Sequence, residues 1–315
     1  MLSTVPFEYP ANLLAEVLAG NVQRFGSILK DANTGLIVGH MQESGVAQSL
    51  LSALSSGIPT PLSLVSEAIN VGSGVYTAVQ VGQLKAMMET LQALQVATLG
   101  VSLVSVGVSV AGFLYMHKRF NALDGKIDQL IGAVNAGFEG QQKANLRMHM
   151  SRTKSLMQRA RQAHALYDPR PEYVEVAAGL TEQAAYFEGE AAFLISAKGR
   201  INLQLFWQLA QMLMLCNNVR IDCRIRTNEM RHALEVSETI ASEYRNLFDP
   251  LTPVSFDTSA SDGLAAIKVL RDATDAAASK PYLLDYLRTR RIDGGEYIAS
   301  LEREKEHPLL ILKEN

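Results

Sequence analysis

The chain has 315 residues, a net charge of −3 and an apolar fraction of 48%, which excludes a disordered chain and a strongly basic nucleic-acid-binding protein. Its only cysteines, Cys216 and Cys223, exclude a disulfide framework: in a helix their Cα atoms would lie roughly 10.5 Å apart, too far for a bridge. The first ten residues lack the basic start and apolar core of a signal peptide, so we expect a cytoplasmic protein.

Residues 1–43 predict a short helix followed by a β-hairpin. Apolar residues recur at helical spacing between Pro10 and Val22, and Gly20 can end this helix. The segments RFGSIL and LIVGHM then flank the turn-rich stretch from Lys30 to Gly35. We expect Asn33 and Gly35 to take the positive-φ positions of the hairpin turn.

Residues 44–84 contain a single charged residue, Glu67. Pro59 and Pro61 interrupt this stretch, which predicts two short apolar helices at about 45–56 and 62–80. Each is short for a bilayer crossing, so an interfacial, re-entrant or buried helical hairpin fits better than two transmembrane spans.

An uncharged segment of 27 residues, 90–116, lies between Glu89 and His117. A helix of this length would measure roughly 40 Å, against roughly 30 Å for the hydrocarbon core of a bilayer. Three basic or titratable residues, His117, Lys118 and Arg119, follow it at once. By the positive-inside tendency, they would keep the downstream half in the cytoplasm if the helix inserts.

Residues 78–165 predict one long helical tract with a heptad seam, a line of positions spaced alternately by four and three. In the uncharged half the seam is small: Thr98, Ser102, Ser105, Ser109 and Gly112. In the charged half it is large: Met116, Leu123, Ile127, Leu130 and Val134, with Phe120 beside it. Small seams suit close helix packing in a membrane, whereas large seams suit a coiled coil in water. Three interpretations stay open for residues 90–116, namely a permanent span, conditional insertion after a trigger, and a buried core helix.

Residues 141–167 carry basic side chains and no acidic one before Asp168. Lys143, Arg147, Lys154 and Arg161 share one predicted helical face, while Leu146, Met150, Met157 and Ala160 share another. Such a helix could hold anionic lipid headgroups through Lys118, Arg119 and these four cations. The alternative is a solvated face paired with acidic residues such as Glu182, Glu188 and Glu190; nucleic acid is a weaker possibility, because no aromatic residues interleave with the charges.

Residues 168–315 predict a soluble helical domain with five further helices. The break at Asp168–Pro171 precedes helices at about 172–197, 201–247, 261–278, 281–289 and 295–306. The six histidines have no metal-ligand spacing, and the glycine-rich stretches lack a phosphate-loop pattern. We therefore expect no enzyme, no metal and no cofactor, and we interpret Cys216 and Cys223 as packed core residues.

These patterns predict a mainly α fold, an elongated bundle with a long central helix or coiled coil and a small N-terminal β-hairpin. The expected domains are 1–43, 44–167 and 168–315. The segment Ala93–Phe120 and the heptads after it resemble the architecture of α-helical pore-forming toxins, without matching a specific motif. The resemblance implies an oligomeric protein that acts on a membrane, such as an effector of a bacterial immune or self-killing system. The alternative is a soluble scaffold or adaptor, whose partner is another protein and whose uncharged segment is a buried core helix.

Overall fold

A computed structural model describes residues 15–17, 19–25, 28–41, 140–197, 199–303 and 309–310. The uncharged segment 90–116 and the heptad seam from Thr98 to Val134 lie outside the described residues, as do the helices expected at 45–56 and 62–80. In the described part the fold is mainly α with one small antiparallel sheet, which confirms the predicted class.

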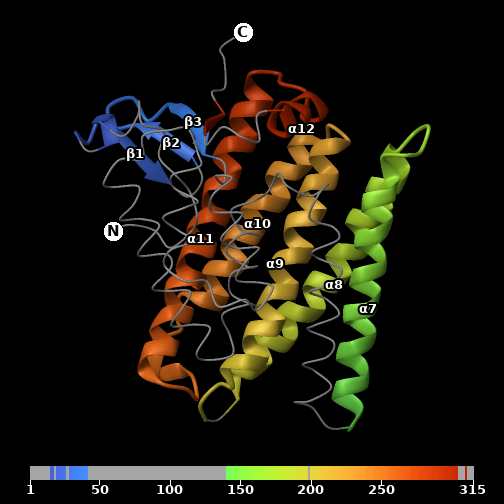
Figure 1. The fold of residues 1–315 in the computed structure, drawn as a ribbon, viewed down its shortest axis with the longest axis vertical. Helices are drawn as coiled ribbons and strands as arrows, with labels where there is room; N and C mark the ends of the chain where they lie inside the picture. The colour runs from blue at the N-terminus through green and yellow to red at the C-terminus, as the bar shows by residue number, and fades with distance from the viewer. Residues whose placement is uncertain are drawn as a thin grey trace, which may run out of the picture.

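Among the described residues, five long helices lie side by side in chain order and alternate in direction, and a sixth, shorter helix packs against the third of them (Figure 1). They are α7 (Gly140–Ala163), α8 (Arg170–Ser196), α9 (Leu203–Arg226), α10 (Met230–Phe248), α11 (Ala260–Thr289) and α12 (Gly294–Arg303), with a short 3-10 turn, η1 (Pro253–Ser255), before α11. α7, the described end of the long tract predicted over 78–165, forms one edge of the row, and the sheet lies beside α11 at the other edge. The helix at the centre is α9.

α9 is buried on nearly all sides. Nineteen of its 24 residues are buried, and its aromatic side chains contact neighbouring elements. Phe206 lies 6.3 Å from Phe248 of α10 and 5.6 Å from Phe256 after η1, measured between ring centroids. α8 packs along most of α9, and α7 packs mainly on α8, so one apolar core runs from α7 to α12.

The predicted hairpin is present, within a larger sheet. β2 (Ile28–Asp31) pairs antiparallel with β3 (Ile37–Met41), as expected around Lys30–Gly35. The expected first strand RFGSIL is divided, because β1 (Val22–Phe25) pairs back on β2. β4 (Leu309–Leu310), which the sequence did not predict, pairs with β3 and completes the order β1-β2-β3-β4.

The hairpin turn has one of its two expected positive-φ residues. Gly35 has a φ of +69°, as predicted, whereas Asn33 is not among the described residues with positive φ. The reason is a local cap: Asp31 Oδ1 accepts the backbone N–H groups of Asn33 at 3.0 Å and Thr34 at 2.7 Å. With this cap, the residues of the turn before Gly35 keep a negative φ. Gly20, expected to end the first helix, has a φ of +79° and donates its N–H to Val17, the last described helical residue.

Two predicted helix boundaries were wrong. The single helix expected over 201–247 is two, α9 and α10, because Asn228 adopts a left-handed φ of 59°. The N–H of Asn228 bonds to the Ile225 carbonyl and that of Glu229 to the Arg224 carbonyl, which is the Schellman arrangement of a helix end. Conversely, the helices expected at 261–278 and 281–289 are one, since α11 continues through Pro281. Burial of Ala277 and Leu284 on either side offsets the hydrogen bond that the proline lacks.

Candidate functional site

α7 carries four of the residues predicted to contact anionic lipid. Arg147 is exposed, Lys154 and Arg161 are partly buried, and Lys143 belongs to the first turn of the helix. Lys118 and Arg119 lie outside the described residues. Arg147, Lys154 and Arg161 are spaced by seven and therefore lie along one side of α7.

Other basic residues of α7 bind acidic residues of α8. Arg152 bonds to Glu182 at 2.9 Å, and Arg159 bonds to Glu172 at 2.6 Å and to Glu175 at 2.7 Å. Hydrogen bonds from Arg159 hold the pKa of the Glu172 carboxyl below its usual value. Pairing with α8, the alternative to lipid contact, thus applies to Arg152 and Arg159. Because these pairs are largely exposed, they contribute little to stability.

The two remaining faces of α7 are distinct. The predicted apolar face is confirmed, since Leu146, Met150, Met157 and Ala160 are all buried. The opposite face is an exposed, uncharged stripe with alternating spacings of four and three. The stripe consists of Ala144, Met148, Ser151, Ser155, Gln158 and Gln162. We call it the α7 stripe; Met148 in it is 59% exposed.

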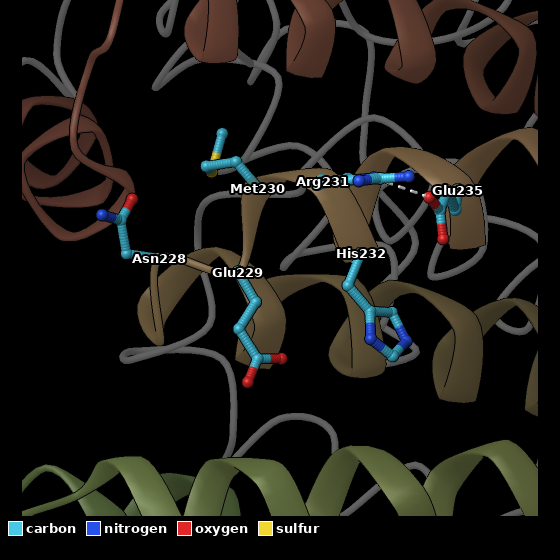
Figure 2. Close-up of a pocket in the computed structure, with 6 residues that line it drawn as sticks. All are labelled: Asn228, Glu229, Met230, Arg231, His232 and Glu235. Atoms are coloured by element: carbon cyan, nitrogen blue, oxygen red, sulfur yellow. Dashed lines mark hydrogen bonds and ion pairs between the residues drawn. The ribbon is translucent and has the colours of Figure 1, made fainter.

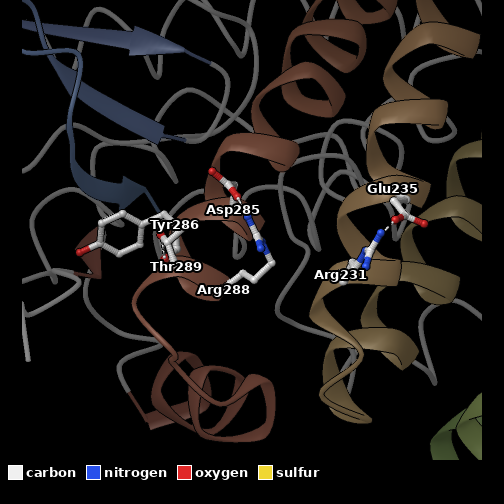
Figure 3. A network of polar contacts seen from close by, with 6 residues as sticks. All are labelled: Arg231, Glu235, Asp285, Tyr286, Arg288 and Thr289. Atoms are coloured by element: carbon white, nitrogen blue, oxygen red, sulfur yellow. Dashed lines mark hydrogen bonds and ion pairs between the residues drawn. The ribbon is translucent and has the colours of Figure 1, made fainter.

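A shallow surface pocket of about 450 Å³ opens at the start of α10 (Figure 2). It is lined by Asn228, Glu229, Met230, Arg231, His232 and Glu235. Arg231 bonds to Glu235 at 3.1 Å, while Glu229 and His232 point to the other side of the helix. The Arg231–Glu235 pair and the Asp285–Arg288 pair of α11 each stay within one helix and are exposed (Figure 3). None of these contacts sets up a nucleophile with a base, so the pocket carries no catalytic assignment.

A buried polar cluster lies where α9, α11 and α12 meet. We call it the Asp222 cluster, and its members are Asn218, Asp222, Arg226, Lys280 and Tyr297. Arg226 bonds to Asp222 Oδ2 at 2.8 Å, and Lys280 donates from Nζ to Asn218 Oδ1. The Tyr297 hydroxyl is buried without a hydrogen-bond partner. Burial of a polar group without a hydrogen-bond partner carries a desolvation cost.

Burial perturbs the titratable groups of this cluster. It lowers the pKa of Lys280 to about 7, an effect that the Asp222 carboxylate partly opposes. Burial also raises the pKa of Tyr297, and Asp222 adds to that rise. Burial also raises the pKa of Tyr173 of α8; Arg226 opposes this rise and Asp222 adds to it.

A second buried charged group lies between α9 and α10. The Arg220 guanidinium is 3.8 Å from Glu243 of α10, and its Nε is buried without a partner. Burial raises the pKa of Glu188, with Glu243 raising it further and Arg220 lowering it. Arg220 thus pairs with α10, whereas Arg226 and Asp222 pair within α9. Glu188 was expected as a partner of α7; the charges that act on its pKa are those of Glu243 and Arg220.

The two cysteines are core residues, as predicted. Cys216 and Cys223 are buried and not bonded to each other. Burial raises the pKa of Cys216 to about 12 and raises that of Cys223 as well, which makes both thiols poor nucleophiles. Cys216 lies against Thr153 of α7, with 3.9 Å between Sγ and Oγ1.

No family model matches the chain, and no curated protein or solved structure is similar enough to be matched. Within the described ranges, no three His, Cys, Asp or Glu side chains are placed to hold a metal ion. Among the described helices, none has the length and apolarity needed to cross a bilayer. The resemblance to pore-forming toxins therefore stays a prediction.

Sequence reasoning missed the Asp222 cluster because its members are far apart in the chain. Lys280 follows an alanine-rich run and directly precedes Pro281, which marks it as a lysine in an apolar setting. This sequence context indicates that Lys280 is buried, but it does not indicate which residues contact it. Asp222 and Arg226 pair within α9, and only the packing of α11 and α12 brings Lys280 and Tyr297 to them.

Proposed function

We propose that this protein oligomerises through α7 and its preceding heptads, and that it acts on a membrane through residues 90–116. In this proposal the bundle of α7–α12 stays in water, as in a pore-forming or membrane-disrupting effector. The observation that carries the proposal is the exposure of the α7 stripe. A seam can bring two copies together only if the bundle leaves it uncovered.

The α7 stripe continues the register of the heptad seam. Val134 is the last residue of the predicted large seam. Counting seven residues from Val134 gives Gln141, and further steps of three and four residues give Ala144 and Met148, the first two residues of the α7 stripe. The buried face of α7 lies on the opposite side of the helix. If α7 belongs to the same rod as the seam, the seam face points away from the bundle and toward solvent.

The charges beside the α7 stripe predict the conditions under which two copies of the protein would associate. Arg147, Lys154 and Arg161 lie on one side of it, and Arg152 and Arg159 lie on the other. Cations beside both edges of a seam repel those of a second copy. α8 carboxylates offset this repulsion at Arg152 and Arg159. We therefore expect association to be weak in dilute buffer and stronger on anionic lipid or in high salt.

A specific observation favours the alternative, a soluble scaffold or adaptor. α9 demonstrates that this chain builds a helix buried on nearly all sides, which is what residues 90–116 would be in that case. The two segments differ in charge, however. α9 contains Arg220 and Asp222 in its buried part, whereas residues 90–116 contain no charged residue at all.

Cysteine crosslinking tests the oligomer. The two natural cysteines are buried, so Ser151→Cys introduces an accessible thiol on the α7 stripe. Thr239→Cys, exposed on α10, is the matched control. With vesicles containing phosphatidylglycerol, we expect disulfide-linked dimers of the Ser151→Cys protein and few of the control. Equal crosslinking of both variants, or none, would contradict association through the stripe.

Dye release from the same vesicles tests the membrane activity separately. We expect the full chain to release dye, and Ser105→Leu or Gly112→Leu to abolish release while the circular dichroism of the protein in solution is unchanged. Crosslinking through Ser151→Cys without sedimentation on vesicles or dye release would favour the scaffold. Because the trigger is unknown, release is measured at pH 5, 6, 7 and 8 and in low and high salt.

A further inference from the structure

We propose that the end of the bundle where α7 begins contacts the surface of a lipid bilayer through three exposed side chains, Phe193, Val254 and Leu264. We call these three residues the apolar end. This inference rests on the proposed action on membranes, and it assigns the side of the bundle that faces the lipid. The partner is the interfacial layer of a bilayer, where headgroups meet acyl chains.

The apolar end brings together large apolar side chains from three segments. Phe193 lies in the last turn of α8, Val254 in η1, and Leu264 near the start of α11. Their exposed fractions are 61%, 73% and 47%. The end of α8, η1 and the start of α11 lie at the same end of the bundle, the lower one in Figure 1.

These segments are joined to one another by backbone contacts. The N–H of Ile201, which follows α8, donates to the Ser255 carbonyl of η1 at 2.8 Å. A Cβ on Gly263 of α11 would lie 2.5 Å from the Pro253 carbonyl oxygen, so the start of α11 packs directly on η1. The apolar end is therefore a surface on a fixed backbone frame.

The point at which the chain enters the bundle favours this end over the opposite one. Residues 117–139 join the uncharged segment 90–116 to Gly140, the first residue of α7, which lies at the apolar end (Figure 1). Leu166 and Tyr167 are also exposed, but they follow α7 at the opposite end. A helix of 24 residues places them about 36 Å farther along the bundle.

The charges beside the apolar end indicate how it would bind lipid. Exposed residues of both signs are present, with Arg200 and Lys268 against Asp249 and Asp257. Because these charges offset one another, the contact gains free energy mainly from burial of apolar side chains. We therefore expect it to depend little on salt or on the fraction of anionic lipid, in contrast to association through the α7 stripe.

Fluorophores on single cysteines test the contact. The natural cysteines are buried, so Val254→Cys and Tyr167→Cys can each be labelled with an environment-sensitive dye, at opposite ends of the bundle. On vesicles of phosphatidylcholine and phosphatidylglycerol with a nitroxide-labelled lipid, we expect quenching at position 254 to be severalfold stronger than at position 167. Equal quenching, or stronger quenching at position 167, would overturn the contact. A blue shift at position 254 without vesicles, on raising the protein concentration, would indicate a contact between copies and would overturn it as well.

Paired substitutions supply a second measurement. Phe193→Ser combined with Val254→Ser should weaken sedimentation on these vesicles about tenfold. The matched control, Leu166→Ser combined with Tyr167→Ser, should leave it unchanged, and all four positions are exposed, so both variants should fold. Equal losses for the two variants would contradict the contact.

The outcomes separate this contact from the proposed function. Dye release by the natural protein, with the label at position 254 unquenched on the same vesicles, would overturn the contact alone. Absence of both sedimentation and dye release under all of the pH and salt conditions would contradict the proposed function, and the contact with it.

Discussion

α7 and α9 have the same length, 24 residues, but differ in how the bundle uses them. α7 lies at the edge and buries one face, with basic residues and the uncharged α7 stripe on its other sides. α9 lies at the centre and buries 19 residues, among them Gln208, Gln211, Asn217, Arg220 and Asp222. The bundle thus hides polar groups at its centre and leaves an uncharged face at its edge.

This difference divides the roles of the two helices. A helix that keeps one face uncovered can take part in association without unfolding the core. In a central helix, buried polar atoms depend on hydrogen bonds from the neighbouring helices, so a substitution in those neighbours changes the stability of the bundle. We therefore expect substitutions in α9 to act on stability and those on the α7 stripe to act on assembly.

The largest expected effect comes from the apolar part of α9. Phe206 is fully buried between Phe248 and Phe256, so Phe206→Ala should lower the free energy of unfolding by about 4 kcal/mol. Met148→Ala on the α7 stripe should change it by less than about 0.5 kcal/mol. Urea denaturation followed by circular dichroism measures both. Similar losses for the two variants would remove the distinction between centre and edge.

The charged residues of the two helices provide a second comparison. Arg220→Met leaves Glu243 and Glu188 without their shared cation in a partly buried site, and should cost about 3 kcal/mol at pH 7. Adding Glu243→Gln should recover part of this loss. Arg152→Met breaks an exposed pair with Glu182 and should cost about 0.5 kcal/mol. A larger loss for Arg152→Met than for Arg220→Met in urea denaturation would contradict the assigned burial.

The edge of the bundle could be predicted from sequence better than its centre. Leu146, Met150, Met157 and Ala160 recur at helical spacing because one face of α7 is buried and the rest is not. Pro169 and Pro171 likewise marked the start of α8, and the turn residues marked the hairpin. These signals are local, so they do not depend on which elements come to lie beside them.

The centre lacks such a signal because α9 is buried on nearly all sides. Without alternation between apolar and polar residues, its end at Arg226 could not be located, and it merged with α10. The continuity of α11 through Pro281 likewise depends on burial from neighbouring helices, and β4 depends on pairing between residues 309–310 and β3. The Asp222 cluster forms from three helices, and no spacing within the chain encodes it.

The turn between α9 and α10 gives a smaller expected effect than Phe206→Ala or Arg220→Met. Asn228 combines a left-handed φ of 59° with an Oδ1 that accepts from Gly294. Asn228→Ala loses the hydrogen bond and strains the backbone, so it should cost about 2 kcal/mol. Asn228→Gly loses the hydrogen bond but tolerates the φ, so it should cost about 1 kcal/mol. Urea denaturation of the two variants separates the contribution of the backbone from that of the side chain. Equal losses in the free energy of unfolding would mean that the left-handed φ contributes nothing. The contact with α12 alone would then make Asn228 necessary here.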